Sequence, residues 1–393
     1  MGDAVIVSTA RTPIASADEG SLADIADYSA AFEAWLSTEC ATLAAVCEPI
    51  VDYGQRVEAM RAFMAELFEA GWARYGWPVA LGGLGGTIAH RAVMWEVAAR
   101  FGVQGMALFE HLEILAPTLA VHGPSELIAD LLPRFLSGRE LWAQGFSEPN
   151  AGSDLANLRT TAVLDGDSYR ITGQKIWTSW ARYATWCLVL ARTGEPGSAH
   201  RGLSAFIVDL RSPGVDVRAI EQANGTDELA EVFFDEVVVP ADRIVGTVGG
   251  GWAVAMHILS NERGTFAWFR HCFLYQQLLD AAGRATARDD VAFGDALLDL
   301  AAVTATGYAG VRAHGLGHQL GVKAAYTKLL LCASEQSVND AVLASDEGIA
   351  IGPFDAQTAL RRQEYLFSRI VTVYGGSQQM QLDTIAKQIL RLP

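Results

Sequence analysis

Two histidines in the stretch HGLGH have a spacing that suits metal binding. His314 and His318 stand four residues apart, which places both side chains on one face of a helix. No glutamate lies between them as in a HExxH motif, and the sequence offers no evident third ligand. A packed or solvated helix face is the better interpretation, and we expect no metal site.

The five cysteines are scattered and include no CxxC pair: Cys40, Cys47, Cys187, Cys272 and Cys332. This pattern predicts neither a disulfide framework nor a zinc site, and it is typical of a reducing cytoplasm. We therefore expect a cytoplasmic protein.

A glycine-rich stretch, GWPVALGGLGGT, raises the question of a phosphate-binding loop. Its glycines are Gly82, Gly83, Gly85 and Gly86. No strand precedes them and Pro78 breaks the run, so a dinucleotide fingerprint is disfavoured. We expect a loop between helices.

The bulk composition excludes several classes of protein. The chain has 393 residues, of which 51% are apolar and 19% charged, so it can bury more than one core. Its net charge of −16 repels phosphate backbones, which argues against nucleic-acid binding. No apolar run approaches the ~20 residues of a membrane span, and no signal peptide is recognised.

Three segments of the chain have different sequence patterns, and the elements they predict must hold any functional site. Residues 21–140 space apolar side chains by three and four, as amphipathic helices do. Residues 141–247 contain short alternating segments, with a hairpin signal at Asp165-Gly166-Asp167. Residues 248–393 return to long amphipathic helices. The sequence thus predicts an α+β multidomain protein in the order α, β, α.

Residues 1–20 are predicted to be an N-terminal extension. The stretch AVIVSTARTPI within them resembles the opening strand of thiolases, but nothing downstream continues that match. We infer no thiolase chemistry from it.

The most specific motifs lie between Trp142 and Gly194, where SEPNAGSD is followed by GQKIW. This segment resembles the middle domain of acyl-CoA dehydrogenases, and the similarity continues through GWARYGWPVALGGLGG, EVFFDEVVVPADRIVG, GGGWAVAMHILSNERGT and VYGGSQQMQLDTIAKQILRLP. The resemblance implies an N-terminal helical domain, a central β-barrel and a C-terminal four-helix bundle. It also implies FAD, an acyl-CoA substrate and an electron-transfer flavoprotein as electron acceptor.

Dehydrogenation of an acyl thioester has three chemical requirements. A carboxylate must take the α-proton, donors must stabilise the developing enolate, and a flavin must accept a hydride from Cβ. The resemblance implies that Phe146 and Ser147 line the flavin ring. It implies that Trp177 packs against the ring, while Thr178 and Ser179 supply hydrogen bonds near its reactive nitrogen.

The resemblance assigns three further contacts. Ser153 stands where relatives meet the CoA portion, and Ser377 and Gln379 stand where relatives touch FAD. Alternatives stay open, because SEPNAGSD also suits a strand end with a turn, and Trp177 alone could be a core residue.

The catalytic base is the least ordinary feature. Medium- and short-chain relatives carry it in a Tyr-Glu-Gly-Thr stretch, but here the matching run YGGS places Gly375 at the base position and keeps only a backbone N–H as oxyanion donor. Long-chain and isovaleryl-type relatives carry the base in a Glu-Arg pair on the first C-terminal helix. The resemblance therefore implies that Glu262 is the base, with Arg263 at the substrate. The alternative is an exposed charge pair on that helix.

Residues that relatives use across a subunit interface are missing. Asp290 replaces an arginine and Ala301 a glutamine that reach the FAD of the neighbouring subunit. This departure resembles an actinobacterial branch, including steroid side-chain dehydrogenases, in which two different chains form an α2β2 assembly. We expect a homologous partner subunit, with a homo-oligomer as the alternative. A non-catalytic partner subunit and a flavin oxidase or monooxygenase remain the competing functions.

Overall fold

The computed structural model describes residues 19–104, 107–195, 197–284, 290–318, 320–345, 352 and 355–392, and it divides into helical and sheet regions along the chain. The predicted extension at residues 1–20 lies almost wholly outside the described residues. The first region consists of α1 (Glu19–Thr38), α2 (Leu43–Cys47), α3 (Tyr53–Glu69), α4 (Ile88–Arg100), α5 (Ala107–His122) and α6 (Ser125–Leu136).

Side-chain caps fix where two of these helices start. The Asp52 carboxylate accepts from the backbone N–H of Gln55 at the start of α3, and Thr87 caps α4. The glycine-rich stretch lies between α3 and α4, which confirms the predicted loop. Gly83 has no room for a side chain, because a Cβ there would lie 2.1 Å from the carbonyl oxygen of Trp77.

The second region is an eight-stranded sheet. Its strands are β1 (Trp142–Gly145), β2 (Thr161–Asp165), β3 (Ser168–Lys175), β4 (Trp186–Arg192), β5 (Leu203–Asp209), β6 (Val215–Ala219), β7 (Ala230–Pro240) and β8 (Ile244–Val245). The pairing order is β6-β7-β3-β2-β4-β5-β8, with β1 parallel to β4. The predicted hairpin is confirmed, since β2 and β3 are antiparallel with Asp165 opposite Ser168.

The sheet is buried on both faces at its centre. In β4, Leu188 and Leu190 belong to the large core shared with the helices, while Cys187 and Val189 belong to a second core within the sheet region. This alternation explains why WCLVLAR reads as an almost continuous apolar run.

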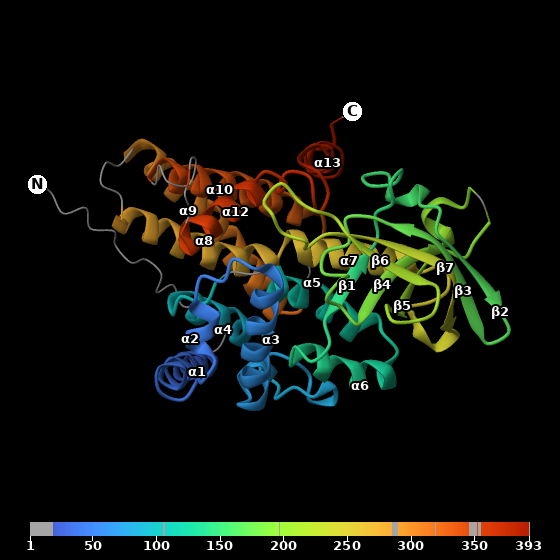
Figure 1. Ribbon diagram of the computed structural model, residues 1–393, viewed down its shortest axis with the longest axis horizontal. Coiled ribbons are helices and arrows are strands. Elements are labelled where there is room, and N and C mark those ends of the chain that lie inside the picture. The colour runs from blue at the N-terminus through green and yellow to red at the C-terminus, as the bar shows by residue number, and fades with distance from the viewer. Residues whose placement is uncertain are drawn as a thin grey trace, which may run out of the picture.

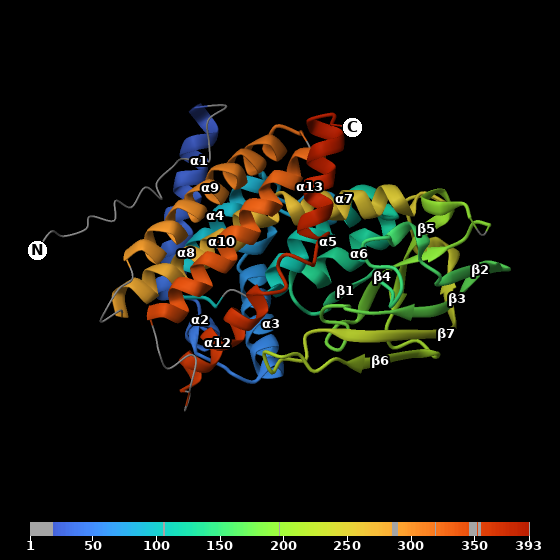
Figure 2. The same cartoon turned by 90° about the horizontal axis from the view of Figure 1, so that it is seen from above.

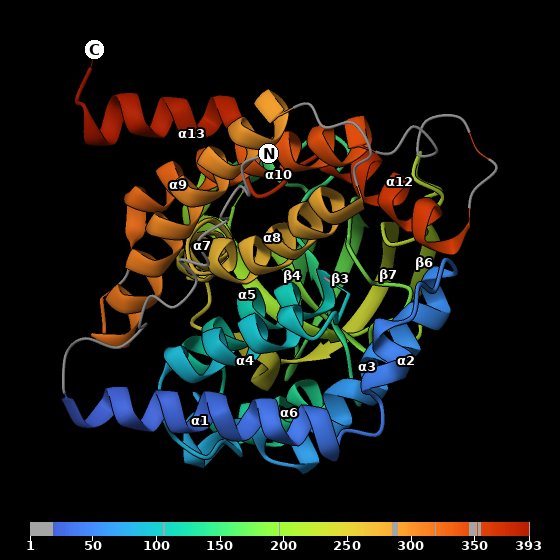
Figure 3. The ribbon, with the colours of Figure 1, turned by 90° about the vertical axis from the view of Figure 1, so that its left-hand side faces the viewer.

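Helices return after β8: α7 (Gly251–Arg263), α8 (Phe266–Arg284), α9 (Asp290–Gly315), α10 (Ala324–Ser345), α12 (Ala356–Ser368) and α13 (Gln378–Thr384). Figures 1 and 2 show α8, α9 and α10 side by side, with the sheet at the other end of the molecule. Helix α7 contacts β5 as well as α5, α8 and α10, so it joins the sheet to the helices. Figure 3 looks along the molecule from the helical end, with the sheet behind.

The two histidines do not share a helix face. Helix α9 ends at Gly315, so His318 lies beyond it and is exposed. Among the described residues, no group of three or more potential ligands is arranged to hold a metal ion. All five cysteines are free thiols. Within the described ranges, no helix has the length and apolar character needed to cross a membrane.

Candidate functional site

Glu262 lies in the last turn of α7, on the inward face of that helix. It follows Ile258 by four residues and Val254 by eight, and both of these side chains are buried. Its Oε2 atom is buried and has no hydrogen-bond partner among the described residues. The carboxylate therefore points into the protein, unlike that of an exposed charge pair on a helix.

Gly375 lies directly against this carboxylate. A Cβ on Gly375 would lie 2.8 Å from Oε1 of Glu262 and 3.1 Å from its Cδ. The φ of Gly375 is 65°, in the left-handed region that favours glycine. The Glu262 carboxylate thus occupies the space that a side chain at position 375 would need.

Arg263 holds the loop that contains Gly375. Its Nε donates to the carbonyl oxygen of Gly375 at 2.7 Å, and Nε2 of Gln381 donates to that of Gly376 at 3.0 Å. These bonds tie the loop to α7 and α13. The observed contact of Arg263 is structural, and its predicted contact with substrate stays a proposal.

Burial and charge act in opposite directions on Glu262. Burial raises the pKa of its carboxyl above the ordinary value, while the positive charges of Lys328 and Arg263 lower it. The net direction is upward, which suits a proton acceptor.

A second group of predicted residues lies where β1 and β3 end. Phe146 and Ser147 follow β1, and the backbone N–H of Ile176 donates to the carbonyl oxygen of Ser147 at 2.9 Å. Nζ of Lys175 donates to the carbonyl oxygen of Phe146 at 3.1 Å and to Oε1 of Glu148 at 2.8 Å. The two motif segments are thereby held together.

Glu148 and Lys175 form a buried ion pair in this group. Burial alone would raise the pKa of Glu148, but Lys175 and the N–H groups of Arg159 and Thr160 hold it below the ordinary value. Burial lowers the pKa of Lys175 to about 8, against the opposing effect of Glu148. The pair anchors the SEPNAGSD loop from inside.

Trp177 and Thr178 are arranged as a ligand-facing segment would be. Trp177 is 57% exposed, so it is not a core residue. Its φ is 59°, in the left-handed region. Such conformations of non-glycine residues concentrate at functional sites. Thr178 exchanges backbone hydrogen bonds with Ala230, yet its buried Oγ1 has no partner among the described residues. An exposed indole beside an unsatisfied hydroxyl fits a flavin ring.

Four predicted residues lie apart from these close contacts. Ser179 is half-buried beside Thr178, while Ser153 and Gln379 are exposed. The hydroxyl of Ser377 caps α13 by accepting from the N–H of Met380 at 3.3 Å. Their contacts with CoA or FAD stay predictions.

Several buried charged residues were not among the predicted site residues, including Glu148, Lys175, Glu228 and Lys328. For Lys175 and Lys328, the position in the sequence pattern indicated burial. Lys175 lies an even number of residues after the buried Tyr169 and Ile171 of β3, so its side chain lies on the same face of the strand. Lys328 shares the face of α10 that buries Leu331.

Family comparisons agree with this geometry. Residues 26–139 match the model of the acyl-CoA dehydrogenase N-terminal domain, and residues 143–237 match that of the acyl-CoA dehydrogenase middle domain. A relative from Mycobacterium tuberculosis, acyl-CoA dehydrogenase IpdE1, is 37% identical over 94% of this chain and 98% of its own length.

Solved structures extend the agreement to the whole fold. The structure named Tcur3481-Tcur3483 steroid ACAD has a TM-score of 0.78 and 25% identity, covering 97% of this chain and all of its own. The ChsE4-ChsE5 complex from Mycobacterium tuberculosis, at 23% identity and a TM-score of 0.76, covers 96% of this chain and 99% of its own and shares the fold.

The fold and the family comparisons define a flavin-dependent oxidoreductase. The chain belongs to the acyl-CoA dehydrogenase family, it is an acyl-CoA dehydrogenase by class, and FAD is its cofactor. The predicted family, its fold and its likeness to the steroid-type branch are confirmed.

Proposed function

We propose that this chain is the base-bearing subunit of an enzyme that converts an acyl-CoA thioester to the 2-enoyl-CoA. The observation that carries the proposal is the position of the Glu262 carboxylate, which fills the space left by the missing side chain of Gly375. In this mechanism Glu262 takes the α-proton through its unsatisfied Oε2. FAD, when bound, supplies the acceptor for the hydride from Cβ.

The loop at Gly375 stabilises the charge that develops on the substrate. The Cα–H bond breaks as Glu262 takes the proton, and the electron pair left behind places negative charge on the thioester oxygen. When hydride leaves Cβ, this electron pair forms the Cα=Cβ bond, and the charge on the thioester oxygen is released. The backbone N–H of Gly375 donates to that oxygen. Arg263 contributes by fixing the carbonyl of Gly375, and this orients the neighbouring peptide.

The Glu262→Gln variant tests the assignment of the base. It keeps the shape of the side chain but cannot accept the proton, so we expect turnover to fall on the order of 10²–10⁴-fold while FAD stays bound. Glu126→Gln, on the exposed face of α6, is the matched control. Retained turnover in Glu262→Gln with bound FAD would remove Glu262 as the base.

We propose that a homologous partner chain completes the FAD site. The two-part name of the steroid ACAD structure supports such an assembly. Exposed apolar side chains on α9 and on or just before α13 also support it: Val291, Leu297, Leu298, Val373, Met380 and Leu382. Both helices contact α10 (Figure 3). Purification of the chain alone and with candidate partners, followed by FAD stoichiometry, distinguishes this assembly from a homo-oligomer.

We propose a steroid-derived acyl-CoA as substrate and an electron-transfer flavoprotein as acceptor. The steroid ACAD structure supports the substrate class, and the family supports the acceptor. A panel of acyl-CoA thioesters screened for flavin bleaching tests the first point. Turnover with the flavoprotein as acceptor tests the second, and oxygen consumption in its absence would favour an oxidase instead.

A further inference from the structure

Lys328 on α10 is fully buried close to the proposed base, and burial lowers the pKa of its ammonium below the ordinary value. Its side chain is 1% exposed, and Nζ has no hydrogen-bond partner among the described residues. Nζ lies 3.8 Å from the ring centroid of Tyr374, which is a cation–π contact. A charge without a hydrogen bond is costly to bury, so its presence calls for an electrostatic explanation.

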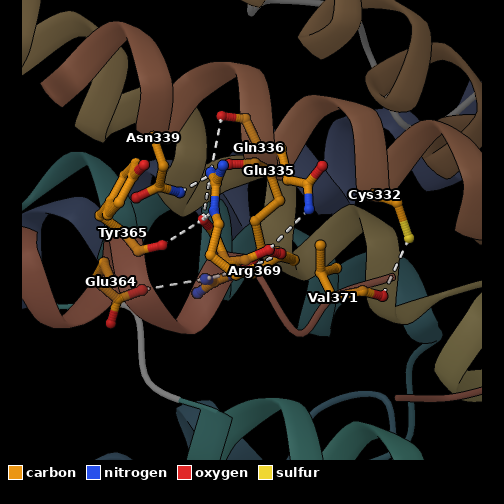
Figure 4. A network of polar contacts seen from close by, with 10 residues as sticks. Cys332, Glu335, Gln336, Asn339, Glu364, Tyr365, Arg369 and Val371 are labelled. Carbon is orange, nitrogen blue, oxygen red and sulfur yellow. Dashed lines mark hydrogen bonds and ion pairs between the residues drawn. The ribbon is translucent and has the colours of Figure 1, made fainter. Parts of the chain in front are cut away.

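Glu335, which lies on the same helix as Lys328, already has its charge neutralised. Glu335, two turns after Lys328, accepts from Arg270 of α8 at 2.9 and 3.3 Å. Arg270 also binds Glu364 of α12 at 3.1 Å, and Figure 4 shows Glu335 and Glu364 within this network of polar contacts. The thiol of Cys332 donates to the carbonyl oxygen of Val371, and burial raises its pKa, so it carries no charge near neutral pH.

The remaining charged groups around Lys328 come from α7. They are Glu262 and Arg263, and Arg263 is engaged by the carbonyl of Gly375. Asp383 of α13 is paired with Lys387 at 2.8 Å. Glu262 is therefore the carboxylate near Lys328 that no ion pair or hydrogen bond satisfies within the described residues.

One short loop brings the two charges together. The ammonium lies over the ring of Tyr374, and the carboxylate lies against the next residue, Gly375. We infer that Lys328 is a positioning residue that keeps Glu262 in its charged, proton-accepting form. The inference rests on the proposed role of Glu262. Lys328 opposes the effect of burial at that carboxylate without touching the substrate.

The Lys328→Met variant tests this role in the FAD-loaded assembly. Without the ammonium, the larger of the two positive charges that oppose the effect of burial on Glu262 is gone, so the pKa of Glu262 rises. The acidic limb of the pH profile of kcat/KM should therefore move to higher pH by about one unit. Lys328→Arg retains a charge and should restore the limb. Lys323→Met removes an exposed lysine just before α10 and should leave the limb in place.

The inference would be overturned if the acidic limb of the kcat/KM profile of FAD-loaded Lys328→Met lay at the same pH as that of the unaltered enzyme. Glu262 would still stand as the base, because Glu262→Gln tests that point separately. If Lys328→Met fails to bind FAD, the double variant Lys328→Met/Glu262→Gln decides. Recovery of FAD binding would show that the two charges are coupled, and continued failure would show that Lys328 acts through packing alone, against the inference.

Discussion

At the scale of single residues, the candidate base depends on the absence of a side chain at Gly375. A methyl group there would lie 2.8 Å from Oε1 of Glu262, well inside van der Waals contact, and the φ of 65° adds strain. The carboxylate and the loop cannot both keep their positions in a Gly375→Ala variant.

We expect Gly375→Ala to lower kcat on the order of 10²-fold, because a displacement of about 1 Å can cost that much in catalysis. Stopped-flow measurement of flavin reduction under saturating acyl-CoA would measure the effect. Gly283→Ala in α8 is the control, since a Cβ there meets no atom within 4 Å. Unchanged flavin reduction in Gly375→Ala would contradict the close approach of Glu262.

At the scale of elements, the pair of Lys175 and Glu148 joins the ends of β1 and β3. Lys175→Met leaves the Glu148 carboxylate buried without its cation, and we expect a loss of about 3–5 kcal/mol in the free energy of unfolding. Urea denaturation would measure it. Weaker FAD binding should accompany this loss, because the carbonyl oxygen of Phe146 would lose its hydrogen bond from Lys175.

Arg170→Met removes an exposed cation from the same strand and serves as the control. A second comparison, Lys175→Met/Glu148→Gln, removes both charges and should lose less stability than the single variant. Equal stability of Lys175→Met and the unaltered protein would show that the pair does not anchor the loop.

The order of elements could be predicted from the sequence because periodicity is a local property. Spacings of three and four gave the helices, and alternation around Gly166 gave the β2–β3 hairpin. The pairing of β3 with β7 could not be predicted this way, because those strands lie far apart in the chain and no local pattern specifies their partner.

The same distinction applies to the site. The motif residues were found from their sequence context, but the contact of Arg263 with Gly375 spans 112 residues and depends on how α7 meets a distant loop. Lys328 and Lys175 lie on apolar faces, which periodicity indicates, yet their partners come from other elements. Periodicity can locate a buried charge, whereas only the packed structure shows what it acts on.

At the scale of the whole molecule, Glu228 lies where the three regions meet. It lies before β7, and residues from the other two regions act on its carboxyl: Tyr53 of α3 and Glu364 of α12. Burial raises its pKa to about 7, and the charge of Glu364 adds to this, although Trp180 and Tyr53 lower it. The protonation of one carboxyl is thus linked to the packing of all three regions.

This linkage has a definite sign. Below the ordinary glutamate pKa of about 4.5, the folded and unfolded states both hold the proton. As the pH rises from about 4.5 to about 7, the unfolded state has released the proton while the folded state retains it, so stability falls. Above about 7 the loss is complete, at about 3 kcal/mol.

The Glu228→Gln variant stays neutral and so mimics the protonated form. Relative to the unaltered protein, its free energy of unfolding should increase by up to about 3 kcal/mol between pH 5 and pH 8. Urea denaturation at several pH values would measure the difference, with Glu221→Gln, an exposed residue of the same loop, as the control. A difference that stays constant with pH would mean that Glu228 is ionised in the folded state, and that its neighbours in the three regions stabilise the charge.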